Sequence, residues 1–148
     1  MKGYDVMGKG IFFTLLIMAT SSIPLYAKNI GINIDNTLTK CKLSAVSTLD
    51  ISSCYNTAIE SWDQELNIQY KLLLKGQHKN VQSGFRNAQR DWIKYRDSEI
   101  SAMQVFYRQE TGTVWGIVML ESKMNIIRDK AIDLYRLRNS KNLSGESE

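Results

Sequence analysis

The chain has 148 residues, of which 43% are hydrophobic and 23% are charged, and its formal net charge is +4. These values are typical of a single globular domain, so an intrinsically disordered chain is not expected. The positive charge is too small to indicate a nucleic-acid-binding surface. Pro24 is the only proline, so no proline interrupts a helix beyond that position.

The first 27 residues have the organisation of an export signal. Lys2 and Lys9 precede the apolar run IFFTLLIMATSSIP, which is shorter than the roughly 20 residues that a membrane-spanning helix needs. The segment LYA at 25–27 ends on a small residue, as signal-peptidase sites do. We predict a signal peptide over residues 1–27, cleaved after Ala27, which leaves a periplasmic or secreted protein of formal net charge +3. The alternative is an uncleaved membrane anchor.

The next segment, KNIGINID at 28–35, alternates polar and apolar residues, which favours extended backbone. We therefore expect an extended lead-in over residues 28–38. A helical domain is expected over 39–138, followed by a flexible tail at 139–148, where the sequence NSKNLSGESE is polar.

Both cysteines, Cys41 and Cys54, follow the signal, and export makes a disulfide between them the expected state. On one continuous helix their Cα atoms would lie about 20 Å apart. A disulfide needs roughly 4.4–6.8 Å, so the chain must reverse direction between them. Ser47 or Thr48 can cap the helix that follows, with Asp50 completing a capping box. The alternative is a pair of free thiols.

Apolar residues recur at helical spacing over three long segments, at about 48–75, 81–109 and 114–138. Gly76 and Gly112 are natural stops for the first two. Short connections make neighbouring helices antiparallel. The expected fold is all-α: a compact antiparallel three-helix bundle with a short N-terminal helix or turn, near 38–46, tethered by the disulfide. The apolar face of the middle helix is predicted to comprise Phe85, Ala88, Trp92, Tyr95, Met103 and Phe106.

Residue sets with catalytic or metal-binding spacing are missing from the sequence. His78 is the only histidine, and it lies in a predicted linker, where it is more often solvated than catalytic. There is no His pair, CxxC motif, acidic calcium loop or phosphate-binding glycine loop. Asp63 and Glu99 could form a carboxylate pair in a bundle. We expect no enzyme, metal or cofactor.

Polar residues also form stripes beside the predicted core faces. Arg128 lies among apolar positions of the last helix, and a half-buried arginine needs a carboxylate partner. We predict that Asp63 or Glu99 accepts hydrogen bonds from Arg96 or Arg128, in a network that fixes helix register. The alternative is a ligand or partner site. The other members of the predicted network are Asn67, Tyr70, Gln89 and Trp92.

Two of these stripes carry a resemblance to a known family. The segment WDQELNIQY at 62–70, preceded by Cys54 and Ala58, and AQRDWIKYRD at 88–97, together with Arg128 and Leu134, resemble the LprI-type domain. This family comprises small exported bacterial proteins and is named after a mycobacterial lipoprotein described as a lysozyme inhibitor. The resemblance covers roughly residues 41–137.

The chain departs from the family pattern at several positions. Ile100 and Leu120 stand where members usually carry two further cysteines, so a hydrophobic contact is expected there in place of a second disulfide. Asn125 stands where members often carry threonine.

The resemblance implies a protein that binds a lysozyme-like peptidoglycan hydrolase and occludes its cleft. Candidate anchors are Tyr107, Arg108 and Trp115, around the predicted turn between the last two helices, although Trp115 could instead pack in the core. The implied partner is a protein rather than nucleic acid, and no stable membrane insertion is expected after signal cleavage. Alternative functions are immunity against a cell-wall amidase delivered by a secretion system, or a non-inhibitory envelope scaffold.

Overall fold

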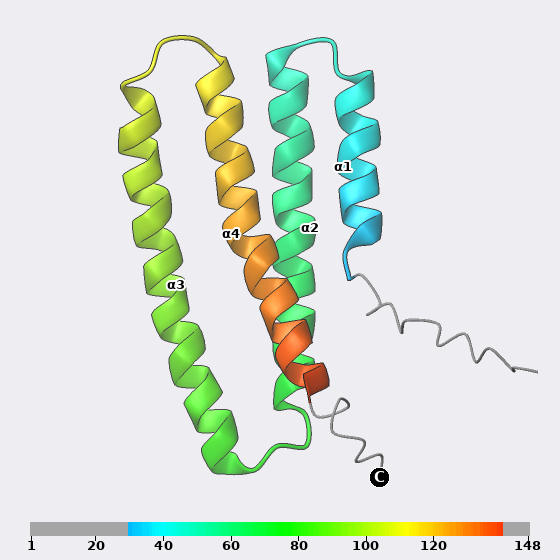
Figure 1. Cartoon of the computed structure of the whole chain (residues 1–148), viewed down its shortest axis with the longest axis vertical. Coiled ribbons are helices and arrows are strands. Elements are labelled where there is room, and N and C mark those ends of the chain that lie inside the picture. Colours follow the sequence, from blue (N-terminus) through cyan, green and yellow to red (C-terminus); the bar gives the residue numbers. More distant parts are fainter. Residues whose placement is uncertain (1–29, 141–148) are drawn as a thin grey trace, which may run out of the picture.

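The computed structural model describes residues 30–140, and in this range the chain forms four helices and no strand. They are α1 (Ile32–Ser44), α2 (Thr48–Leu74), α3 (Lys79–Arg108) and α4 (Val114–Asn139). Consecutive helices run antiparallel, so α2 and α4 run in the same direction (Figure 1). The α1–α2 and α3–α4 connections consequently lie at the same end of the bundle (Figure 1). The predicted signal peptide at 1–27 and the tail beyond residue 140 lie outside the described residues.

The all-α prediction is confirmed, but the three-helix bundle is wrong because α1 is a full helix of 13 residues. The extended lead-in at 28–38 is likewise wrong from Ile32 onward. Gly31, with φ 76°, begins the helix, and its carbonyl accepts a hydrogen bond from the Asp35 N–H at 3.0 Å. Ile34 and Leu38 then lie one turn apart and pack against the core. The polar–apolar alternation at 28–35 is compatible with a strand, but Ile34 and Leu38 also have the four-residue spacing of one helix face.

The core lies mainly between α2 and α4. The capping box predicted at the start of α2 is confirmed, since the Ser47 side chain accepts from the Asp50 N–H and Asp50 accepts from the Ser47 N–H. Trp62, in the middle of α2, is 0% exposed. The other buried residues of the cluster are Tyr55, Ala58, Ile59, Leu66, Leu73, Met124, Ile127, Ala131 and Leu134.

Helix α3 lies beside α4 at the edge of the bundle and contains no fully buried residue (Figure 1). Phe85 and Trp92 pack against the core, as predicted. Tyr95 and Phe106, which were expected on the same buried face, are exposed, and so is Ala88. The apolar stripe of α3 therefore extends beyond the part of the helix that packs against the core.

Helix α1 is attached to the bundle by three side-chain links. The predicted disulfide joins Cys41 to Cys54 with a Cα–Cα distance of 5.7 Å. The Lys42 ammonium donates a hydrogen bond to the Tyr55 hydroxyl at 3.0 Å. At the other end of α1, Asp35 accepts a hydrogen bond from Arg128 of α4 at 3.0 Å.

Gly31 provides a test of how closely α1 approaches the core. A Cβ at this position would lie 2.6 Å from Cζ2 and Cζ3 of Trp62 and closer still to Cη2, whereas a Cβ at Gly76 would meet nothing within 4 Å. The two glycines have nearly equal φ, 76° and 75°, so alanine costs about 1–2 kcal/mol of backbone strain at either. Gly31→Ala should lower the free energy of unfolding by a further ~1–3 kcal/mol through the steric conflict. If urea denaturation showed the same decrease in the free energy of unfolding for Gly31→Ala and Gly76→Ala, this packing would be contradicted.

Removal of the disulfide by Cys41→Ala and Cys54→Ala should also destabilise the fold. The bridge spans a sequence separation of 13 residues, and closing a loop of that size contributes about 3 kcal/mol in the chain-entropy model. Denaturant titration of the oxidised protein, the reduced protein and the double variant measures the difference. An unchanged midpoint would show that the other links hold α1 without it.

Candidate partner-binding surface

The network predicted around Arg96 is present in a looser form than expected. The nearest carboxylate to the Arg96 guanidinium is that of the adjacent Asp97, at 2.8 Å. Asp63 of α2 lies 4.0 Å away, which makes an ion pair but is too long for a hydrogen bond. Asn67 donates to the Asp63 carboxylate at 3.1 Å and so helps to orient it. Arg96 therefore links α3 to α2 mainly by charge.

Arg128 does not pair with Asp63 or Glu99, so that part of the prediction is wrong. Its carboxylate partner is Asp35 of α1, in the segment predicted to be an extended lead-in. The guanidinium also lies over the Trp62 ring, 5.4 Å from its centroid. Glu99 is exposed on α3. Arg128 therefore serves the contact between α1, α2 and α4.

Lys130 of α4 lies beside three further members of the predicted network, Tyr70 of α2 and Gln89 and Trp92 of α3. Trp92 is half-buried, with Arg96 over its ring at 5.4 Å and Lys130 of α4 at 5.6 Å. Tyr70 and Gln89 line a small hollow of about 110 Å³ beside Lys130. These contacts hold α3 to the bundle without burying any of its side chains completely.

Asp63 and Arg96 also line an open groove of about 660 Å³ between α2, α3 and α4. The apolar residues Ile59, Ile100 and Ile127 contribute to its lining. Glu99 does not line it, so the carboxylate pair considered above is not formed there. Within residues 30–140, no group of three or more His, Cys, Asp or Glu side chains could hold a metal ion. The carboxylates that line the groove are those of Glu60, Asp63 and Asp97.

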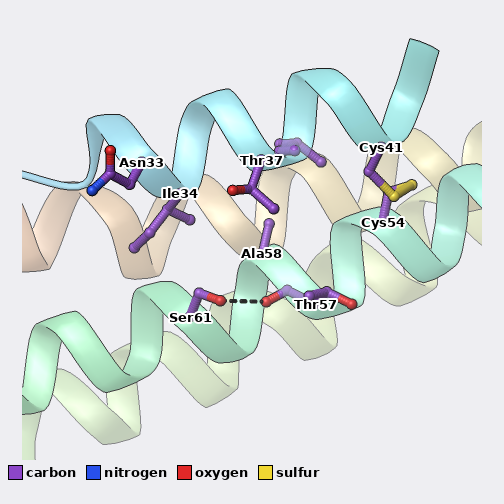
Figure 2. Close-up of a pocket in the computed structure, with 9 residues that line it drawn as sticks. Asn33, Ile34, Thr37, Cys41, Cys54, Thr57, Ala58 and Ser61 are labelled. Carbon is purple, nitrogen blue, oxygen red and sulfur yellow. Dashed lines mark hydrogen bonds between the residues drawn. A yellow bond between two sulfur atoms is a disulfide. The ribbon is translucent and has the colours of Figure 1, made fainter. Parts of the chain in front are cut away.

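A second hollow, of about 210 Å³, lies between α1 and α2 next to the disulfide (Figure 2). Ile34, Thr37 and Ala58 point into the space between the two helices, and the Cys41–Cys54 bridge closes one side (Figure 2). The Ser61 hydroxyl donates to the Thr57 carbonyl at 2.9 Å, so this hydroxyl is already engaged within α2. The lining contains no charged residue and no group suited to catalysis.

The α3–α4 connection brings the predicted anchors together. The rings of Tyr107 and Trp115 stack across the turn, with centroids 6.0 Å apart and an interplanar angle of 21°. Both are half-buried, and neither belongs to the core cluster. Arg108 is exposed beside them. Sequence reasoning missed the exposed apolar residues Val105 and Val114, and it assigned Phe106 to the core although 62% of its surface is exposed.

The α1–α2 connection carries a second set of exposed apolar residues, Leu43, Val46 and Leu49, which the sequence reading overlooked. The available signal was the turn itself, because the segment LSAVSTL must reverse direction and yet contains three large apolar residues and no charged one.

The charged residues that flank this turn are engaged within the protein. The Ser47 side chain and the backbone N–H groups of Val46 and Ser47 hold the pKa of the Asp50 carboxyl below its usual 3.8. Its contribution to stability is thus present above the unfolded-state pKa and is lost as pH falls through the folded-state value. The hydrogen bond to the Tyr55 hydroxyl raises the pKa of Lys42 above 10.5, against an opposing effect of burial.

Comparisons with known proteins agree with this architecture. In the solved structure of an uncharacterised protein from Burkholderia thailandensis, the similarity has a TM-score of 0.65 at 23% sequence identity. It covers 72% of this chain and 53% of that one, so this chain spans about half the length of its structural relative. The likeness shows the fold alone. No curated protein sequence matches the chain.

None of the four described helices is long and apolar enough to cross a membrane. The family profile described as "Lysozyme inhibitor LprI" matches residues 40–134, which include the disulfide, both polar stripes and the two turns at one end of the bundle. This match covers well over half of the sequence, and the chain belongs to the LprI family.

Proposed function

We propose that this protein is a periplasmic or secreted inhibitor that binds a lysozyme-like peptidoglycan hydrolase and occludes its substrate cleft. The family match over residues 40–134 is the observation that carries the proposal. The disulfide fits an oxidising compartment, and the signal peptide predicted over residues 1–27 agrees with export. Arg96 and Arg128 pair with carboxylates of other helices, and this contact between helices supports a structural role for the two arginines.

The α3–α4 end is the proposed inhibitory contact. Tyr107 and Trp115 form a stacked pair beside the exposed Arg108, and aromatic and arginine side chains are the residue types that contribute most at protein interfaces. A stacked pair is restrained before binding, so less side-chain entropy is lost when a partner covers it.

The first test is a lysis assay with the full chain, exported under its own N-terminal segment and purified. Increasing amounts are added to cell-wall suspensions digested by a C-type lysozyme or by a cell-wall amidase. Dose-dependent inhibition of the lysozyme, with a complex that co-elutes in gel filtration, is expected. Inhibition of the amidase alone would favour an immunity protein, and inhibition of neither enzyme would favour an envelope scaffold.

The second test concerns the proposed contact. Arg108→Ala with Trp115→Ala should raise the concentration needed for half-inhibition about tenfold or more, since it removes two anchors from one interface. Tyr95→Ala is the matched control, because Tyr95 is an exposed aromatic residue in the middle of α3. Equal inhibition by the wild type and the double variant would place the contact elsewhere.

A further inference from the structure

The α1–α2 turn at residues 43–49 is the most exposed apolar feature of the described chain. Leu43, Val46 and Leu49 are 83%, 94% and 78% exposed. None of them belongs to the core cluster or packs against it. Polar residues at these positions would form the same turn, so the fold itself does not require three large apolar side chains there.

The turn is held in one shape from both sides. Within the capping box, the Asp50 carboxylate accepts from the Val46 N–H at 3.2 Å, the Ser47 N–H at 3.0 Å and the Ser47 hydroxyl at 2.8 Å. The Asp50 N–H donates back to the Ser47 side chain at 3.1 Å. On the α1 side, the Cys41–Cys54 bridge ties the last turns of α1 to α2. An apolar prong that is already rigid loses little conformational entropy on binding.

The turn is also electrically neutral. The segment 43–49, LSAVSTL, has no charged residue. The nearest charges on either side, Lys42 and Asp50, are hydrogen-bonded within the protein. A neutral convex surface complements an uncharged, apolar concave one. It adds no positive charge to the contact in a protein whose net charge is positive.

Geometry links this turn to the α3–α4 contact. Figure 1 shows both connections at the same end of the bundle. A stable protein–protein interface takes about 20–30 residues from each side, more than one short turn can supply. The two turns together, with the helix ends that carry them, approach that size.

We propose that the turn 43–49 is a second, apolar prong of the inhibitory surface and inserts into the cleft of the bound hydrolase. Ligand clefts are lined predominantly by apolar and aromatic side chains, which Leu43, Val46 and Leu49 would contact. This inference rests on the proposed function. A membrane surface is a poorer fit, because peripheral membrane attachment favours exposed basic residues around the apolar ones. Here the adjacent Lys42 is bonded to Tyr55.

The test compares a turn variant, Leu43→Ser with Val46→Ser and Leu49→Ser, with a control variant, Ile68→Ser with Leu72→Ser. Ile68 and Leu72 are 49% and 40% exposed on α2, away from the turn, and so control for the loss of exposed apolar surface. Val46→Ser alone serves as a milder variant, because its backbone hydrogen bond to Asp50 is retained. Each protein is assayed against the C-type lysozyme, and its melting temperature is recorded.

The turn variant should raise the half-inhibition concentration at least about tenfold. Val46→Ser should give a smaller rise, and the control should match the wild type. Strong inhibition by the wild type and by both turn variants would overturn this inference and leave the proposed function standing. Absence of inhibition by the wild type would remove the proposed function, and this inference with it. Turn-dependent pelleting with anionic phospholipid vesicles, or turn-dependent dimerisation, without turn-dependent inhibition would also overturn it.

Discussion

The burial of the Trp62 indole is the contact on which the remaining arrangement depends. The ring belongs to α2 and is 0% exposed. Gly31 at the start of α1 lies directly against it, and a single added methyl group there would overlap the ring. Arg128 of α4 covers it and continues to Asp35 of α1. The Trp62 side chain thus contacts residues of α1 and α4 as well as its own helix, α2. Arg128, which covers the ring, is paired with Asp35 of α1, the helix that begins after Gly31.

This arrangement separates the tightly packed part of the molecule from the exposed surface that we propose a partner contacts. Helices α2 and α4 carry all of the buried side chains of the described chain. Helix α1 is fixed to them by the disulfide, the Lys42–Tyr55 hydrogen bond and the Asp35–Arg128 pair, whereas α3 is attached by half-buried contacts and by the charges around Arg96. The residues that resemble the family motif therefore build the frame. At one end, this frame carries two turns, and each turn has apolar or aromatic side chains that do not belong to the core cluster. The proposed inhibition by occlusion requires such a surface.

Much of the frame could be predicted from sequence because its signals are local. The spacing of apolar residues located α2, α3 and α4, and the short separation of Cys41 and Cys54 required a reversal that Ser47 and Asp50 could cap. Helix α1 was not predicted at its full length because the pattern INID is compatible with a strand and with one face of a helix. Which of the two forms depends on packing against α2, and the local sequence does not show that contact. The Asp35–Arg128 pair was not predicted for the same reason. It joins residues 93 positions apart, and it forms only because α1 is a helix that packs beside α2 and α4. The turn at Tyr107 and Trp115 was visible in the sequence. The exposure of Phe106 was not, because periodicity does not show where a neighbouring helix stops covering the stripe.

In the proposed complex, a rigid helical frame presents two turns at one end of the bundle to a hydrolase. Hydrogen exchange measured by mass spectrometry, on the protein alone and saturated with a C-type lysozyme, tests it most directly. We expect slow exchange of the amide hydrogens around Trp62 in both states, with new protection confined to residues 43–49 and 107–115. New protection along the groove at residues 96–104, with both turns unchanged, would contradict it.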